Sequence, residues 1–177
     1  MAIPLTTERL LLREIVPEDA VDIFEYSQNP TVGRNAGWKP HESLDETREI
    51  MQTIFLGQKS VWGMVQRETK KLIGSIGLIP DPKRENESVL MLGYALGEPY
   101  WGRGLMTEAA QTVCGYGFGE LRLTGISATT FPDNARSQRV LQKLGFQYEG
   151  SLQQAERLYT GEIMGLNCYF LNSSHCE

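Results

Sequence analysis

The feature that most constrains this chain is a glycine-rich turn between an apolar run and a helical pattern. The apolar run, residues 89–96, is typical of a buried strand. Apolar residues at Leu105 and Ala109 recur at helical spacing and predict a helix. Gly102 and Gly104 therefore lie where a strand turns into a helix N-terminus, whose first amides lack carbonyl partners. Glycines let a ligand approach the backbone, so this turn can bind a phosphate.

Spacing alone leaves two interpretations of this turn. Thr107 stands where a dinucleotide-binding fingerprint would have its third glycine, and no Gly-Lys-Ser/Thr triplet marks a P-loop. A tight turn that uses glycine only for its backbone freedom explains the pattern as well as a phosphate site does.

The bulk properties are those of an ordinary single domain. The 177 residues are 41% apolar and 22% charged, which suits one domain over 1–177 with a sizeable core. No apolar run approaches the ~18 residues of a membrane span, and the first residues do not form a signal peptide. We therefore expect a cytoplasmic protein without a membrane partner. A net charge of −5 without basic blocks argues against nucleic acid as a partner and permits an amine substrate.

The cysteines and histidines predict neither a disulfide framework nor a metal site. Cys114, Cys168 and Cys176 are odd in number and include no close pair. His41 and His175 are far apart, and no cluster has the spacing of metal ligands.

Strand and helix patterns alternate along the chain and predict a mixed α/β fold. Pro17 and the acids after it open a first helix, and Ser43-Leu44-Asp45-Glu46 is a capping-box pattern that opens a second. The segment Asn29–His41 between them is rich in turn residues and is predicted as a loop, either a substrate lid or a connection. Seven strands are expected at residues 10–13, 61–66, 71–79, 89–96, 124–130, 148–153 and 163–171, and two further helices at 105–118 and 137–144.

Several motifs in order make the chain resemble a known superfamily. Asn134-Ala135-Arg136-Ser137 opens the last helix and Leu144-Gly145-Phe146 ends it. With Gly102-Arg103-Gly104 they resemble the GNAT superfamily of acyl-CoA N-acyltransferases. Thr7-Glu8-Arg9-Leu10 and Tyr100-Trp101-Gly102-Arg103-Gly104 with Thr107-Glu108-Ala109 resemble its RimJ/RimL-like branch, which acts on ribosomal-protein N-termini. The resemblance implies an α+β domain with a mixed, mostly antiparallel sheet of about seven strands and four helices, splayed between the central strands.

The resemblance also implies acetyl-CoA as co-substrate and no metal. The pantetheine arm would pair with the strand at Tyr94, Ala95 and Leu96, and Asn134 would hydrogen-bond it, with a helix cap alone as the alternative role of Asn134. The chain departs from the family's loop at Trp101, in place of Gln or Arg, and at Met106, in place of a small residue. The loop that would bind the pyrophosphate comprises Trp101, Gly102, Arg103, Gly104, Leu105, Met106 and Thr107.

Acylation of an amine by a thioester sets the catalytic requirements. The amine must be uncharged, the oxyanion needs a donor such as a free amide near Leu96, and the leaving thiolate needs a hydrogen bond or a proton. The resemblance assigns the last role to Ser137, because Leu141 occupies the place of the tyrosine that other members use. The same Ser137 can be an inert first-turn serine. No Ser/His/Asp or Cys/His arrangement is evident, which fits direct attack without a covalent enzyme intermediate.

The general base and the acceptor are less determined. Glu98 is the candidate base, beside Glu14 and Glu162, and each can also be a solvated charge at a strand end. Trp38, in the predicted loop, is the candidate for the acceptor wall, and it can also be a loop aromatic packed on the core. The expected reaction is acetyl transfer to a primary amine, either a protein N-terminus or a small molecule. A non-catalytic acyl-CoA-binding module is the alternative, and a homodimer is left open.

Overall fold

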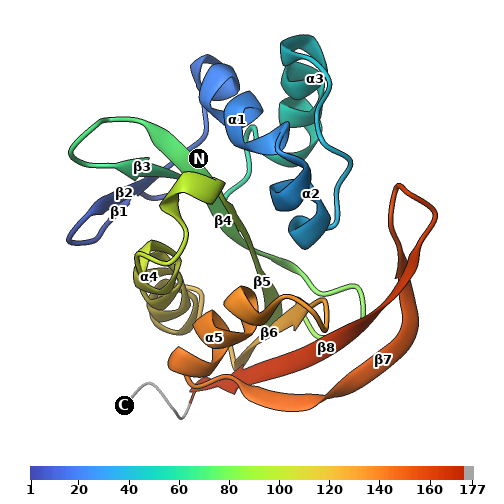
Figure 1. Cartoon of the computed structure of the whole chain (residues 1–177). Coiled ribbons are helices and arrows are strands. Elements are labelled where there is room, and N and C mark those ends of the chain that lie inside the picture. Colours follow the sequence, from blue (N-terminus) through green and yellow to red (C-terminus); the bar gives the residue numbers. More distant parts are fainter. Residues whose placement is uncertain (174–177) are drawn as a thin grey trace.

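The computed structural model describes residues 1–173, so His175 and Cys176 lie outside the described residues. Figure 1 shows one twisted sheet with helices on both faces. The strand order is β1-β2-β3-β4-β5-β6-β8-β7. The strands are β1 Leu5–Thr6, β2 Leu10–Arg13, β3 Val61–Gln66, β4 Leu72–Pro80, β5 Val89–Leu96, β6 Gly125–Thr130, β7 Gln147–Arg157 and β8 Ile163–Asn172. The helices are α1 Ala20–Ser27, α2 Pro30–Ala36, α3 Leu44–Ile54, α4 Leu105–Gly119 and α5 Ala135–Lys143, with 3₁₀ turns at Pro17–Asp19 and Glu98–Tyr100.

The expected mixed sheet is confirmed, but the expected element count was too low. Within residues 1–173 there are eight strands and five α-helices in place of about seven and four. The additional strand β1 has two residues and pairs with β2. A run this short has no periodicity from which to predict it.

The additional helix α2 occupies most of the segment predicted as a loop. The Asn29 side chain accepts hydrogen bonds from the amides of Thr31 and Val32, and Pro30 occupies the first turn. Gly37 ends the helix in the left-handed region, with φ at 87°. An Asn-Pro start and a Gly stop are helix signals, so the sequence held this information. The prediction of a loop over Asn29–His41 was wrong in its first half.

The sheet splits between its two central strands, as expected. Strands β5 and β6 run parallel and pair only at Val89–Met91 with Gly125–Ser127. Beyond Met91, β5 stays paired with β4 up to Leu96, while β6 pairs with β8 up to Thr130. The two strands therefore diverge, and the facing edges of residues 92–96 and 128–130 have no partner strand.

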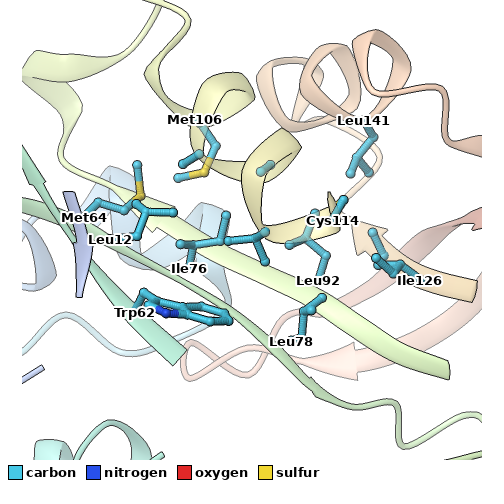
Figure 2. Packing of buried hydrophobic residues seen from close by; sticks show 14 of the residues in the cluster. Leu12, Trp62, Met64, Ile76, Leu78, Leu92, Met106, Cys114, Ile126 and Leu141 are labelled. Atoms are coloured by element: carbon cyan, nitrogen blue, oxygen red, sulfur yellow. The ribbon is translucent and has the colours of Figure 1, made fainter. Parts of the chain in front are cut away.

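Two hydrophobic cores hold the helices against the sheet. The larger core packs α4 and α5 on one face, and it includes Ile76, Leu92 and Met106, which Figure 2 labels. The smaller core packs α1–α3 on the other face around Ile23 and Met51. Burying each such side chain contributes about 1.5–3 kcal/mol. Both cores reach the unpaired part of β5, since Leu92 and Leu96 belong to the first and Ala95 to the second.

Candidate active site

A single large cavity of about 1080 Å³ opens where β5 and β6 separate. One half lies against α4 and α5, and the other half lies against α1–α3. Among the site residues predicted from sequence, those that line the cavity are Trp38, Tyr94, Ala95, Leu96, Trp101, Gly102, Gly104, Leu105, Met106, Thr107, Asn134 and Ser137. Arg103 and Glu98 lie outside this lining.

The N-terminus of α4 faces the cavity without a side-chain cap. Gly104 is the N-cap residue, with φ at 77°, and no side chain bonds the first amides of the helix. Gly102 also has a positive φ of 73°, and a Cβ atom there would meet open space. Uncapped amides and the helix dipole attract an anion, and the bare backbone of the loop lets it approach. This geometry fits the predicted pyrophosphate loop.

The half-buried carboxylate of Glu108 holds this loop in place. Glu108 in α4 accepts hydrogen bonds from the Thr7 hydroxyl at 2.5 Å and from the Arg9 amide at 2.8 Å. The Arg9 guanidinium pairs with Glu108 at 2.7 Å and also donates to the Arg103 carbonyl at 2.9 Å. Burial alone would raise the pKa of Glu108, but the hydrogen bonds from Thr7 and Arg9 outweigh it and lower that pKa. This cluster explains why the Thr7–Arg9 and Thr107–Ala109 motifs occur together.

The two departures from the family's loop have distinct environments. Trp101 donates from Nε1 to the Leu96 carbonyl at 2.7 Å, and the Arg136 guanidinium lies 4.4 Å from its ring centroid. It therefore ties the loop to both β5 and α5. Met106 is 6% exposed and its side chain belongs to the large core, as Figure 2 shows.

The unpaired edge of β5 presents backbone groups to the cavity. The Gly97 amide donates to the carbonyl of Ile73 in the neighbouring strand β4, at 2.8 Å. Because ladder bonds alternate along an antiparallel strand, Ala95 also bonds toward β4. The backbone groups of Tyr94 and the amide of Leu96 then point toward the split, while the Leu96 carbonyl accepts from Trp101. This is the arrangement expected for pairing with a pantetheine arm and for a free amide near Leu96.

The first turn of α5 lies across the split. Asn134 caps it, since its side-chain oxygen accepts from the Ser137 amide at 3.2 Å. The Ser137 hydroxyl is 2.7 Å from the phenol oxygen of Tyr94. Burial raises the pKa of Tyr94 to about 12. Leu141, one turn further on, is fully buried in the core. The cap on Asn134 thus exists, and its role toward the cofactor stays a prediction.

A buried polar atom without a partner lies in the same part of the cavity. Thr130, at the end of β6, is 4% exposed, and its hydroxyl makes no hydrogen bond within the protein. Buried hydroxyls in folded proteins nearly always find a partner. Together with the uncapped α4 and the free edge of β5, this hydroxyl fits a cavity that holds a long polar ligand.

The other half of the cavity is lined by side chains of the α1–α3 layer. Trp38 lies between Tyr26 and His41, with ring centroids 6.5 Å and 6.4 Å apart respectively. The Tyr26 hydroxyl lies 3.2 Å from the Ser75 hydroxyl, and Ser75 pairs with Ala95 of the split strand. This wall is therefore joined to β5. Trp38 both packs on the smaller core and lines the cavity.

His41 is a cavity residue that the sequence analysis considered only as a metal ligand. Its Nδ1 lies 2.9 Å from the Thr47 hydroxyl, which itself donates to the Ser43 carbonyl at 3.0 Å. The Thr47 hydroxyl proton is used in that bond, so Nδ1 must donate and Nε2 carries the lone pair. Burial lowers the pKa of His41, which favours the neutral ring. The Ser43 cap was visible in the sequence, but its contact with His41 was not.

The three carboxylates considered as bases lie away from the cavity lining. The Glu98 carboxylate accepts from the Asn29 side-chain amide at 2.7 Å, at the start of α2. Glu14 follows β2 and Glu162 precedes β8, both in exposed or partly exposed positions. Glu46 and Glu156 do line the cavity, and neither was predicted. Glu98 as the general base stays a prediction.

The described part of the chain has neither a cluster of metal-ligand side chains nor a membrane-spanning helix. Residues 1–173 contain no group of three His, Cys, Asp or Glu side chains placed to hold a metal ion. Within the same residues, every helix is too short or too polar to cross a membrane.

The sequence matches the model of a known family. The family described as "Acetyltransferase (GNAT) domain" matches residues 9–147, and the chain belongs to this family. It is 36% identical over 154 residues to "Uncharacterized N-acetyltransferase YoaA" of Bacillus subtilis, covering 85% of this chain and 86% of that protein. It is 30% identical over 156 residues to "[Ribosomal protein uS5]-alanine N-acetyltransferase" of Escherichia coli, covering 82% and 79%.

A solved structure has the same fold. Spermidine N-acetyltransferase from Vibrio cholerae, in complex with CoA and spermine, superposes with a TM-score of 0.78 at 20% identity, covering 94% of this chain and 96% of that one. The chain is accordingly an acetyl-CoA-dependent N-acetyltransferase with a GNAT fold. The predicted superfamily and fold class are confirmed.

Proposed function

We propose that this protein transfers the acetyl group of acetyl-CoA to a primary amine by direct attack, without a covalent enzyme intermediate. The observation that carries the proposal is one continuous cavity that joins the uncapped helix α4 to the unpaired edge of β5 and to the wall of α1–α3. An anion site, a strand edge and a separate side-chain wall match a cofactor and an acceptor that meet at the split.

The residues of the α4–α5 half hold the acyl donor. The amides of Leu105, Met106 and Thr107 bind the pyrophosphate, with Gly102 and Gly104 giving access to them. The Tyr94–Leu96 edge pairs with the pantetheine arm, and the Asn134 side chain keeps its NH₂ group available after capping α5. Acetyl-CoA is a substrate here, and it supplies the activated acyl group.

The chemical steps need three groups from the protein. The Leu96 amide faces the split and donates to the developing oxyanion. Ser137 donates to the departing sulfur, since its hydroxyl lies beside the split. Glu98 is the proposed base, and it acts through water because its carboxylate lies outside the cavity lining.

The acceptor half favours a protein N-terminus over a polyamine. Its acidic residues Glu46 and Glu156 share the lining with Lys39 and Lys83, so it is not a concentrated anionic pocket. A polyamine carries several positive charges and needs such a pocket. The relative that acts on a ribosomal-protein alanine, at 30% identity, supports the same choice.

The test is a panel of amines assayed for release of CoA. Peptides that begin with different residues, amino-acid amides and spermine are compared at equal concentration. The proposal expects acetylation of peptide N-termini and little turnover of spermine. Turnover of spermine alone would contradict the acceptor class. Tight binding of CoA by calorimetry with no turnover of any amine would instead favour a non-catalytic acyl-CoA-binding module.

A further inference from the structure

The strongest unexplained contact in the cavity joins two hydroxyl groups. The Tyr94 phenol, on β5, lies 2.7 Å from the Ser137 hydroxyl, on the first turn of α5. Both residues line the cavity beside the split. Tyr94 enters the proposed function only through its backbone, so the phenol has no role in it.

The direction of this hydrogen bond follows from distance and acidity. The Tyr94 phenol has a second neighbour, the Ser137 carbonyl, at 3.4 Å. Hydroxyl hydrogen bonds to oxygen are about 2.5–3.0 Å long, so the carbonyl is too far to compete for the phenol proton. A phenol is a stronger acid than an aliphatic hydroxyl, and it therefore donates to the Ser137 oxygen. The proton of Ser137 is then left to point elsewhere.

We propose that the phenol of Tyr94 is a positioning residue, which donates to the Ser137 hydroxyl and thereby directs the Ser137 proton toward the sulfur of bound CoA. This inference rests on the proposed function, because it assumes that CoA occupies the cavity. During transfer the C–N bond forms, the C–S bond breaks, and its electron pair goes to sulfur. The proton of the amine passes through water to the proposed base Glu98, and the thiolate accepts a hydrogen bond from Ser137.

The pKa values of the phenol and of a thiol indicate that Tyr94 orients the Ser137 hydroxyl and does not transfer its own proton. The pKa of its phenol is about 12 in this buried position. A free thiol has a pKa of about 8.5, so moving the phenol proton to the thiolate is disfavoured by roughly 10³-fold. The titratable groups that face the phenol are Cys114 of α4 and Tyr169 of β8. Neither is a carboxylate or a cation, and burial raises the pKa of the phenol by more than the Ser137 hydrogen bond lowers it.

The experiment titrates the thiol of bound CoA by the ultraviolet absorbance of its thiolate. It compares wild type, Tyr94→Phe, Ser137→Ala and the double variant, and it needs no amine substrate. We expect Ser137→Ala to raise the pKa of the bound thiol by about one unit, which is a tenfold weaker stabilisation of the thiolate. Tyr94→Phe should raise it part of the way, and the double variant should equal Ser137→Ala.

A second measurement follows turnover with an accepted amine. Tyr94→Phe should lower kcat several-fold in the wild-type background and leave kcat unchanged when Ser137 is already alanine. The dissociation constant of CoA, from calorimetry, should stay within about twofold, because the ring of Tyr94 is retained. The matched control is Tyr148→Phe, whose exposed hydroxyl also lies 2.7 Å from a serine, Ser151, away from the cavity.

Three outcomes would overturn the inference. One is a bound thiol with wild-type pKa and wild-type kcat in Tyr94→Phe. Another is an equal effect of Tyr94→Phe with and without the Ser137 hydroxyl, which would mean that the two act independently. The third is a parallel loss of CoA affinity, which would make the contact structural. A thiol that titrates as expected in a protein that acetylates no amine would contradict the proposed function and leave this inference standing.

Discussion

The two halves of the cavity are lined by different kinds of chemical group. The half under α4 and α5 offers mostly backbone: an uncapped helix start, two glycines with positive φ and the free edge of β5. The half under α1–α3 offers side chains such as Trp38 and His41. Backbone groups recognise what every acyl-CoA shares, whereas side chains can differ from one relative to another. Under the proposed function, the first half would bind the acyl donor and the second half would select the acceptor.

The largest effect is expected when the glycine loop before α4 is obstructed. Gly104→Val places a branched side chain at a φ of 77°, beside the uncapped amides. The blocked approach to the amides should weaken CoA binding by about 10²-fold, or about 2.7 kcal/mol. The residue held in the left-handed region should also cost about 1–2 kcal/mol of folding stability, equally in the free and the bound protein. Calorimetry on the folded variant measures the loss. The control is Gly57→Val, which has a similar φ of 73° outside the cavity and should leave CoA affinity unchanged. Unchanged affinity in Gly104→Val would refute the loop as the phosphate site.

The next test removes the charge of the Glu108 carboxylate, which pairs with Arg9 and holds the loop before α4 in place. Glu108→Gln keeps the shape but loses the ion pair with Arg9, and it should cost about 2 kcal/mol of unfolding free energy at pH 7. Because the folded-state pKa of Glu108 is lowered, its contribution is present above the unfolded pKa of about 4.3 and is lost as pH falls through the folded value. The gap between wild type and variant should therefore close in acid.

Urea unfolding at several pH values measures that gap. The control is Asp45→Asn, which breaks an exposed pair with Arg48 and should cost no more than about 0.5 kcal/mol. A gap that stays constant down to low pH would show that the carboxylate charge of Glu108 is not what stabilises the loop.

A third test asks whether one side chain in the backbone-lined half takes part in the chemistry. Ser137→Ala should lower kcat by at least roughly tenfold, which is about 1.4 kcal/mol of barrier. The affinity for CoA should change little, because the Asn134 cap bonds the Ser137 amide and not its hydroxyl. Steady-state kinetics and calorimetry separate the two effects, with Ser151→Ala on the exposed β7 as control. A loss of affinity with kcat preserved would make Ser137 a binding residue.

The smallest expected effect lies in the side-chain half. Trp38→Ala removes part of the acceptor wall and should raise the KM of the amine about fivefold, or about 1 kcal/mol. The affinity for CoA should stay near that of wild type, because the loop and the edge of β5 are untouched. The melting temperature is the control, since Trp38 also packs against Tyr26 and His41. A fall in CoA affinity with an unchanged KM would reverse the assignment of the two halves.

The sequence by itself determined the backbone-lined half. Glycine spacing, the apolar run 89–96 and the helical period after Gly104 are local signals, and they placed the loop and the strand that the structure has. The helix caps at Asn134 and Ser43 could also be predicted from the sequence, since capping depends on residues within one turn of each other. The start of α2 was equally local, and its signals at Asn29, Pro30 and Gly37 were missed.

Only the tertiary structure decided the contacts between distant segments. Glu108 accepts hydrogen bonds from Thr7 and Arg9, which lie about a hundred residues away in the sequence. The Tyr94 phenol is hydrogen-bonded to Ser137, which lies 43 residues away. Strand β7 extends to Arg157 although nearly all its residues are exposed. Its own sequence lacks a buried apolar face, and pairing with β8 holds it as a strand. A sequence pattern reports what one segment will bury, but which two segments share a contact is set by packing of the whole sheet. The loop was therefore predictable from the residues in order, whereas the Thr7–Arg9–Glu108 cluster that holds it and the Tyr94 partner of Ser137 were not.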